Sequence, residues 1–256
     1  MRIATFNVNG VNGRLERLLD WLADTKPDVA CLQELKSDSF PARALEQAGY
    51  GAVWHGQKSW NGVAILARGA APIETRRGLP GEGSGAQARY IEAAVKGVLV
   101  GCLYAPNGNP VGSARYAAKL AWYDRFAAHA EALLATGQPV ALAGDYNIMP
   151  TDLDVYAPER WRGDALFQPE LKARYAALRD AGWVDGIRDV FGEGERVYTF
   201  WKYWRNAFQR DAGLRIDHVL LSPVLAARLE SAGVDSHHRA KAGASDHAPA
   251  WVELEG

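Results

Sequence analysis

The stretch Val140-Ala141-Leu142-Ala143-Gly144-Asp145 is a short apolar run that ends on a carboxylate. Runs of this kind, bounded by Gly, Pro or Asn, predict buried β-strands and recur along most of the chain. The other predicted strands are Arg2–Asn7, Val29–Gln33, Gly51–His55, Gly62–Ala67, Tyr90–Val95, Val98–Tyr104, Arg215–Leu221 and Ala248–Leu254. We therefore expect a core built from packed β-sheets.

Three segments between these strands have helical periodicity, namely Leu15–Ala23, Ser113–Ala135 and Pro169–Ala181. Ser113 is suited to cap the second helix, and Gly and Pro residues follow the second and third. Helices at intervals among strands predict an α+β sandwich, with sheets packed together and covered by helices. Chains of this length often form one domain, so residues 1–256 are expected to be a single domain.

The composition is that of an ordinary globular protein. Hydrophobic residues make up 48% of the chain and charged residues 23%, which disfavours intrinsic disorder. The net charge of −1 argues against a surface coated in positive charge for nonspecific binding of nucleic acid. The net charge is still compatible with one basic face that binds nucleic acid, because such a surface depends on how the cations are distributed and not on their total.

The N-terminus and the cysteines favour an intracellular protein. Met1 leads directly into a strand-like run without a secretory signal, and no stretch approaches the roughly 20 apolar residues of a membrane span. Cys31 and Cys102 each lie in an apolar run, where two buried reduced thiols are favoured and a disulfide is left open. We expect a cytoplasmic location and no membrane partner.

Polar side chains fall at the ends of the predicted strands, where rigid scaffolds present functional groups. They are Asn7, Glu34, Tyr104, Asp145, Asp217 and the pair Asp246-His247. Carboxylates and amides without cysteine make an oxygen-rich site, which suits magnesium or manganese. Zinc would require more His or Cys at ligand spacing.

A metal ion with oxygen ligands stabilises charge on a phosphoryl group and lowers the pKa of a bound water. A carboxylate such as Asp217 beside His247 would orient the imidazole and favour its charged form. Together these groups fit the hydrolysis of a phosphate ester. Taken singly, each is more often a surface, capping, turn or structural residue, so the argument depends on their joint arrangement.

Six motifs in order give the chain a resemblance to the exonuclease III and abasic-site endonuclease family, over nearly its full length. They are Thr5–Gly10 with Leu32–Lys36, Gln57-Lys58 with Asn61–Ala64, Tyr104–Asn107, Gly144–Asn147 with Pro150–Asp152, Leu214–His218, and Ser245–Pro249. The resemblance implies a DNase I-like fold, with two mostly antiparallel or mixed sheets flanked by helices. It also implies Mg²⁺ as cofactor, with Mn²⁺ as a substitute.

The same resemblance implies roles for the site residues. Glu34 would be the chief magnesium ligand, and the residues near one or two metal positions would be Asn7, Asp145, Asn147 and Asp246. Asp145 would hold or activate the attacking water, which Asn147 would help to position. His247, oriented by Asp217, would bind the scissile phosphate. Tyr104 would stabilise the phosphate or the leaving group, in the form associated with DNA repair enzymes.

Substrate contacts are predicted at Lys58, Asn61, Arg89, Asn107, Trp201 and Arg215. The segment Tyr198–Arg205 mixes aromatic rings, which stack on bases or sugars, with cations, which contact phosphates. Core packing is an equally good interpretation of single aromatics here. We name Trp201 as the DNA-contacting wedge. Asn9 departs from relatives that carry Asp at this position, which weakens a role as direct metal ligand.

The predicted function is Mg²⁺-dependent DNA phosphodiesterase activity in base-excision repair by a monomer. Its partner would be duplex DNA with abasic sites or with recessed or blocked 3′ ends. One alternative keeps the site but acts on RNA or a small phosphate ester, and another is a catalytically silent DNA-binding relative. The adjacent pair His237-His238 could bind metal, although a solvated exposed pair is favoured.

Overall fold

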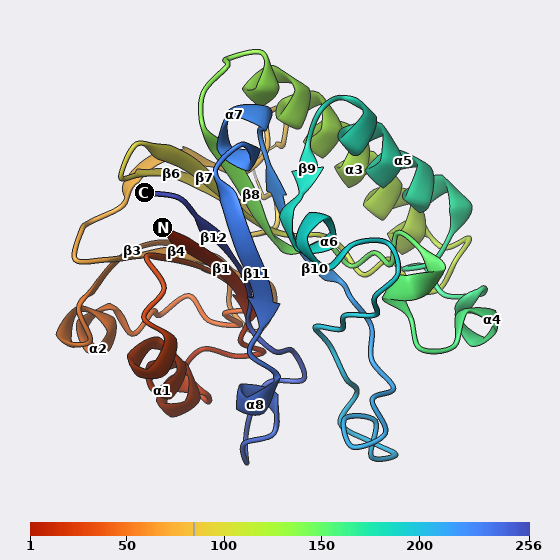
Figure 1. Ribbon diagram of the computed structural model, residues 1–256, viewed down its shortest axis with the longest axis horizontal. Helices are drawn as coiled ribbons and strands as arrows, with labels where there is room; N and C mark the ends of the chain where they lie inside the picture. The colour runs from red at the N-terminus through yellow and green to blue at the C-terminus, as the bar shows by residue number, and fades with distance from the viewer. Residues whose placement is uncertain (84) are drawn as a thin grey trace.

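In the part of the chain that the computed structural model describes, residues 1–83 and 85–256, the strands form two six-stranded sheets (Figure 1). The first sheet has the order β11 (Leu229–Val234), β12 (Ala250–Leu254), β1 (Arg2–Asn7), β2 (Val29–Gln33), β4 (Val63–Arg68) and β3 (Tyr50–His55). The second has the order β5 (Ile73–Arg77), β6 (Tyr90–Val95), β7 (Val98–Tyr104), β8 (Val140–Asp145), β10 (Asp217–Leu221) and β9 (Val184–Asp185).

Each sheet contains one parallel pair among antiparallel neighbours. In the first sheet β1 is parallel to β2, and the connection carries α1 (Leu15–Thr25). In the second sheet β7 is parallel to β8, and the connection carries α3 (Ala114–Leu134). Parallel strands need such a crossover, whereas antiparallel strands can be joined by short turns. The predicted fold of two mixed sheets flanked by helices is confirmed.

The core lies between the sheets, where the aliphatic inner faces form one cluster. Cys31 and Cys102 belong to this cluster as free buried thiols, so the prediction of reduced cysteines is confirmed. The outer face of the first sheet is covered by α1 and α2 (Ala42–Gln47), and that of the second by α3 and α5 (Pro169–Asp180) (Figure 1). The side chain of Ser113 caps α3 by accepting a hydrogen bond from the Tyr116 amide, as predicted.

Several elements were missed by the sequence analysis. The strand β5 is exposed throughout and carries charged residues, so it lacks the apolar signal of a buried strand. The strands β9 and β11 were also missed, as were the short helices α2, α4 (Pro158–Trp161), α6 (Gly186–Phe191), α7 (Pro223–Ala226) and α8 (Ser236–Arg239). Within the described residues, no helix has the length and apolar character needed to cross a membrane.

The topology brings the polar strand ends together. Parallel strands end at the same edge of a sheet, so Asn7 lies beside Gln33 and Tyr104 beside Asp145. The antiparallel strand β10 begins at that edge, with Asp217 directly opposite Asp145. The antiparallel strand β12 pairs with β1, so the segment that leads into β12 returns to the end of β1. This shared edge is where the candidate site forms.

Candidate active site

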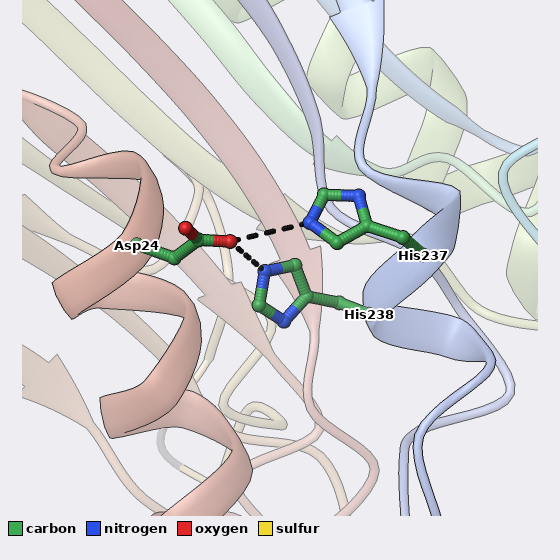
Figure 2. Close-up of side chains that lie close together, drawn as sticks. All are labelled: Asp24, His237 and His238. Carbon is green, nitrogen blue, oxygen red and sulfur yellow. Dashed lines mark hydrogen bonds and ion pairs between the residues drawn. The ribbon is translucent and has the colours of Figure 1, made fainter.

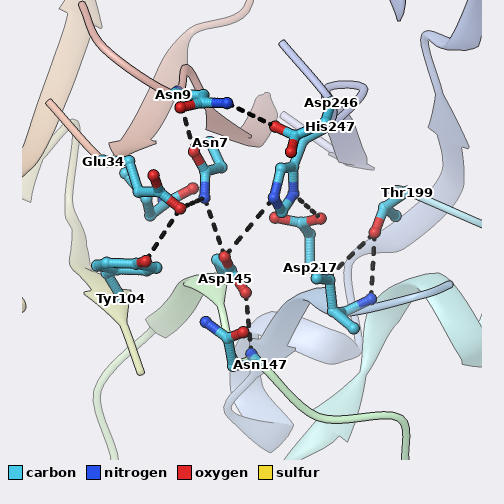
Figure 3. Close-up of polar contacts among 12 residues, drawn as sticks. Asn7, Asn9, Glu34, Tyr104, Asp145, Asn147, Thr199, Asp217, Asp246 and His247 are labelled. Atoms are coloured by element: carbon cyan, nitrogen blue, oxygen red, sulfur yellow. Dashed lines mark hydrogen bonds and ion pairs between the residues drawn. The ribbon is translucent and has the colours of Figure 1, made fainter. Parts of the chain in front are cut away.

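Asn7 links two carboxylates that come from different sheets (Figure 3). Its side-chain nitrogen donates hydrogen bonds to Glu34 Oε1 and to Asp145 Oδ2, both at 2.9 Å. The Asn7 oxygen accepts a hydrogen bond from the backbone N–H of Asn9 at 3.0 Å. Asn7 therefore holds the carboxylates of β2 and β8 close together at the edge of the sandwich.

Glu34 follows β2 in the left-handed backbone region, with φ 54°. Such backbone strain is maintained by the surrounding structure and clusters at functional sites. Lys36 Nζ lies 2.7 Å from Glu34 Oε2. Burial alone would raise the pKa of Glu34, but the hydrogen bonds from Lys36 and Asn7 outweigh it, so this pKa is lowered. Glu34 is thus an ionised carboxylate at neutral pH.

Candidate ligand atoms of Glu34, Asp145 and His247 all lie within 4.8 Å of one another. The two carboxylates offer the hard oxygen donors that Mg²⁺ and Mn²⁺ prefer. The charges of Asp217 and Asp145 raise the pKa of His247 and favour its protonated form, and a protonated imidazole cannot ligate a metal. The residues at this position therefore fit a divalent ion held by Glu34 and Asp145.

His247 and Asp217 form a buried ion pair (Figure 3). Asp217 Oδ2 accepts a hydrogen bond from His247 Nδ1 at 2.8 Å, and His247 Nε2 lies 3.8 Å from Asp145 Oδ2. Burial would lower the pKa of His247, but the charges of Asp217 and Asp145 outweigh it and raise this pKa to about 10. Thr199 Oγ1 accepts the backbone N–H of Asp217, which fixes the start of β10.

Asp145 is completely enclosed by the site. Burial raises its pKa to about 7, although the charge of His247 acts in the opposite direction. A carboxylate with a pKa near neutrality is suited to accept a proton from a water. The backbone N–H of Asn147 donates to Asp145 Oδ1 at 2.9 Å, which fixes the carboxylate plane. The residue before Asp145 is Gly144. A larger residue would not fit there, because its Cβ would lie 2.0 Å from the Leu103 carbonyl oxygen.

Tyr104 completes the side of the site formed by β7. Its hydroxyl donates to Glu34 Oε1 at 2.9 Å, and the Arg89 guanidinium lies over its ring, 4.8 Å from the centroid. Burial and the charge of Glu34 raise the pKa of Tyr104 well above its usual value. Tyr104 is therefore a permanent hydrogen-bond donor. Arg89 also donates to the Tyr104 carbonyl oxygen at 3.1 Å, so it has a structural role here. Its predicted contact with substrate stays a prediction.

Lys119 is a buried cation that the sequence analysis did not single out. Its Nζ donates to the backbone oxygens of Asn107, Asn147 and Ala165 at 3.0, 2.6 and 3.3 Å. These three residues belong to three loops around the site. Burial lowers the pKa of Lys119 to about 7. We interpret Lys119 as a positioning residue, which acts through the loops that carry Asn107 and Asn147.

The remaining predicted site residues lie around this centre. Asn147 donates its side-chain amide to the Ala105 carbonyl oxygen at 2.9 Å and accepts from Asn107 at 3.3 Å. Asp246 is half-buried, and its Oδ1 accepts a hydrogen bond from Asn9 Nδ2 at 3.0 Å. The structure therefore brings the predicted catalytic and metal residues to one place, with Asn9 held at their rim.

The site opens into a cavity of about 230 Å³. Its lining combines the polar groups described above with apolar side chains, among them Phe200, Leu214 and Ile216, which we call the apolar wall. A second cavity of about 150 Å³ shares Trp161, Phe200, Lys202 and Leu214 with the first. Its lining includes four cations, Arg160, Lys202, Arg205 and Arg210. A basic surface thus adjoins the site even though the net charge of the chain is −1.

Two predicted DNA contacts are wrong because the side chains are buried. Trp201 is 4% exposed and packs against Tyr198 and Phe208, with its indole N–H donating to Asp211 at 3.1 Å. Arg215 is 1% exposed and lies 2.7 Å from both Asp154 and Asp185. Neither side chain can reach a ligand at the surface.

Asn61 is a third correction. It is buried, and its amide donates to Gln57 Oε1 at 3.0 Å, while Lys36 N donates to its backbone oxygen at 2.8 Å. Asn61 adopts a φ of 53°, a left-handed conformation that asparagine tolerates better than most residues. It is a turn-forming residue beside the site. By contrast, Lys58 and Asn107 are exposed and stay predictions as substrate contacts.

The apolar wall was missed, although its residues flank one that was named. Leu214 and Ile216 stand on either side of Arg215, and side chains alternate between faces along extended chain. Alternation places Leu214 and Ile216 in the cavity and directs Arg215 into the interior, towards Asp154 and Asp185. The same period would have identified these two residues from the sequence.

The sequence profile described as the Endonuclease/Exonuclease/phosphatase family matches residues 4–247, nearly the whole chain. The chain belongs to this family. It is 35% identical to exodeoxyribonuclease III of Haemophilus influenzae, with all of both chains covered. Among solved structures, it is similar to the 3′-5′ exonuclease NExo of Neisseria meningitidis, with 40% identity, complete coverage of both chains and a TM-score of 0.96. It is also similar to an AP endonuclease of Archaeoglobus fulgidus, with 32% identity, complete coverage of both chains and a TM-score of 0.95.

Proposed function

We propose that this chain hydrolyses phosphodiester bonds of duplex DNA during base-excision repair, at abasic sites and at 3′ ends, with Mg²⁺ as cofactor. Membership of the family supports the predicted class, a nuclease that acts on DNA. We further propose that residues 1–256 act as one domain and as a monomer. Because Cys31 and Cys102 are free thiols, we place it in a reducing compartment, the cytoplasm.

The observation that carries the proposal is that a pair of carboxylates and a protonated histidine lie around the same cavity. The ionised Glu34 and the Asp145 carboxylate lie on one side, and the cationic His247 lies 3.8 Å from Asp145 on the other. A phosphate in the cavity would meet a metal bound by the carboxylates and a charged imidazole at once. Both groups stabilise negative charge that develops on phosphoryl oxygens.

Glu34 and Asp145 would hold the divalent ion, with Asn7 keeping the two carboxylates in place. When bound, the ion supplies positive charge beside the phosphoryl oxygens and polarises a water. Mn²⁺ has the same preference for oxygen donors and would substitute. Asp246 stands at the rim of this position, and we propose that it acts there through water.

The chain's own residues then have separate tasks. His247, held by Asp217, would bind a non-bridging oxygen of the scissile phosphate. Asp145 would accept a proton from the attacking water, whose position Asn147 would share in fixing. The bond from phosphorus to the 3′ oxygen breaks, and the leaving oxygen takes up a proton from solvent. The Tyr104 hydroxyl would release Glu34 and stabilise this oxygen by a hydrogen bond. The products are a 3′-hydroxyl and a 5′-phosphate.

The lining of the cavity suggests how the substrate is chosen. We propose that the deoxyribose of the lesion packs against Phe200, Leu214 and Ile216. Turning a nucleotide out of the stack costs least where the base is already missing, which favours abasic sites. The four cations of the adjacent cavity would contact phosphates. The aromatic contact that we assigned to Trp201 would instead come from Trp204, which is 61% exposed and lines that second cavity.

A substrate panel tests the proposal. Wild-type protein with Mg²⁺ would be given equal amounts of a duplex with one abasic-site analogue, a duplex with a recessed 3′ end, a single-stranded RNA and a chromogenic phosphate ester. We expect the two DNA duplexes to be cleaved fastest, with EDTA abolishing the reaction. Faster cleavage of RNA or of the ester would support the alternative substrate classes. DNA binding without cleavage of any substrate would support a silent relative.

A further inference from the structure

A second group of potential metal ligands consists of residues outside the active site (Figure 2). Asp24 near the end of α1 faces His237 and His238 of α8, 213 residues later in the chain. Asp24 Oδ2 lies 3.2 Å from His237 Nε2 and 3.0 Å from His238 Nε2. The sequence favoured a solvated exposed pair, but His238 is 5% exposed and only His237 is open to solvent.

The convergence of the two rings is unusual for adjacent residues. Neighbouring positions on a helix do not share a face, yet the centroids of these rings lie 4.3 Å apart and both Nε2 atoms approach one carboxylate oxygen. With the proton on Nε2, each ring can donate a hydrogen bond to Asp24 Oδ2. With the proton on Nδ1 instead, both Nε2 lone pairs are directed to the position beside this oxygen, where a divalent cation can take the place of the two protons.

Two of the three donor separations match a tetrahedral site. Zinc binds imidazole nitrogen and carboxylate oxygen at about 2.0–2.1 Å, which separates two donors on a tetrahedron by about 3.3 Å. The two measured separations from Asp24 Oδ2 are 3.0 and 3.2 Å, and all three donor atoms lie within 4.8 Å of one another. Two imidazoles and one carboxylate select Zn²⁺ and similar transition metals over Mg²⁺.

The helices that carry these donors are held together independently of any metal. Asp235, at the start of α8, accepts the indole N–H of Trp21 on α1 at 2.8 Å and that of Trp251 on β12 at 2.9 Å. Trp21 lies on α1 close to one turn before Asp24. Its hydrogen bond to Asp235 therefore joins α1 to α8 beside the three candidate ligands. Donors on rigid, mutually braced elements form a site that needs little rearrangement on binding.

We propose that Asp24, His237 and His238 form a binding site for a transition-metal dication of the Zn²⁺ class, separate from the Mg²⁺ position of the active site. Three protein donors leave a fourth position for water. The bound ion would tie α1 to α8, the helix that precedes the segment carrying Asp246 and His247. Binding would therefore stabilise the fold and restrict that segment, and it does not depend on the proposed nuclease function.

Equilibrium binding of Zn²⁺ tests the site, with excess Mg²⁺ present to occupy the active-site carboxylates. Four proteins would be compared, namely wild type, His237→Ala, Asp24→Asn and the control Asp20→Asn, which removes the same charge from the same helix. We expect wild type and the control to bind one equivalent of Zn²⁺ that the other two lose, or bind at least about tenfold more weakly. Co²⁺ in place of Zn²⁺ should give a tetrahedral visible absorption in the first two only.

The temperature of thermal unfolding, measured with and without Zn²⁺, distinguishes loss of the metal site from a general folding defect. His237 is exposed, so His237→Ala should unfold at the wild-type temperature without metal. Zn²⁺ should raise the unfolding temperature of wild type and Asp20→Asn but not of His237→Ala. The proposal is overturned if wild type binds no Zn²⁺ in excess Mg²⁺. It is also overturned if His237→Ala and Asp24→Asn bind Zn²⁺ with wild-type stoichiometry and affinity, which would leave the cluster as ordinary hydrogen bonding.

Discussion

Replacing Asp217 with Asn removes the negative charge beside His247 while keeping the size of the side chain. In the wild type the two side chains are 2.8 Å apart, and the pKa of His247 is raised to about 10. An unperturbed histidine titrates at about 6.5. Because burial lowers the pKa of His247 and Asp217 is the leading charge that opposes it, we expect the pKa to fall towards this value in the variant.

These two pKa values set the size of the effect. At pH 8 a group with a pKa of about 10 is about 99% protonated, whereas one with a pKa of about 6.5 is about 3% protonated. A reaction that needs the charged imidazole would therefore slow by about 30-fold. At pH 6 the second group is about 76% protonated, so the defect would shrink to less than about twofold. The variant should thus lose activity relative to wild type as the pH rises.

The assay is single-turnover cleavage of abasic duplex at pH 6 and pH 8. Only the ratio of variant to wild type is compared at each pH, because the titration of Asp145 affects both proteins. Asp180→Asn, which removes an exposed charge at the end of α5, should retain wild-type rates. A nuclear magnetic resonance titration of His247 would follow its charge directly. An equal defect at both pH values, or a variant His247 still charged at pH 8, would refute the reasoning.

Four further substitutions separate structural roles from functional ones. Arg215→Met should lower the free energy of unfolding by about 3–5 kcal/mol, measured by urea denaturation, because it removes the cation that two buried carboxylates share and leaves Asp154 with Arg188 alone; a loss of DNA affinity at unchanged stability would contradict this. Trp201→Ala should cost about 3–5 kcal/mol as a core truncation, whereas Trp204→Ala should leave the urea midpoint unchanged and raise KM for DNA. Lys119→Met should lower kcat more than KM in steady-state cleavage, because its loops lose a shared donor, and a change in KM alone would argue against a positioning role.

The framework of the fold could be predicted because buried strands carry a strong apolar signal. Five strands, among them β1 and β8, have the predicted bounds. The candidate site followed from the same signal, since polar residues fell at the ends of the predicted strands, where scaffolds present functional groups. The strand β5 could not be found in this way because it is exposed throughout and packs no apolar face. Its position depends on pairing with β6, which is a tertiary contact.

The errors in the site have a common physical cause. A motif names positions but does not say which way a side chain points. Arg215 and Trp201 are typical DNA-contacting residue types. In the structure, however, Arg215 forms buried ion pairs with Asp154 and Asp185, and Trp201 packs against other aromatic rings. Lys119 was missed for the opposite reason. Its partners are backbone oxygens from three loops, and no pattern in the sequence records their convergence.

The central claim is that Asp145 and the divalent ion act together on a DNA phosphodiester. The most direct measurement is the single-turnover rate of cleavage of abasic duplex in Mg²⁺ by wild type and by Asp145→Asn, with matching far-ultraviolet spectra to confirm folding. Removing a general base typically costs about 10²–10⁴-fold, so we predict a loss of at least about a hundredfold, and no cleavage by either protein in EDTA. A rate for Asp145→Asn within about tenfold of wild type, or wild-type cleavage that persists in EDTA, would contradict the account.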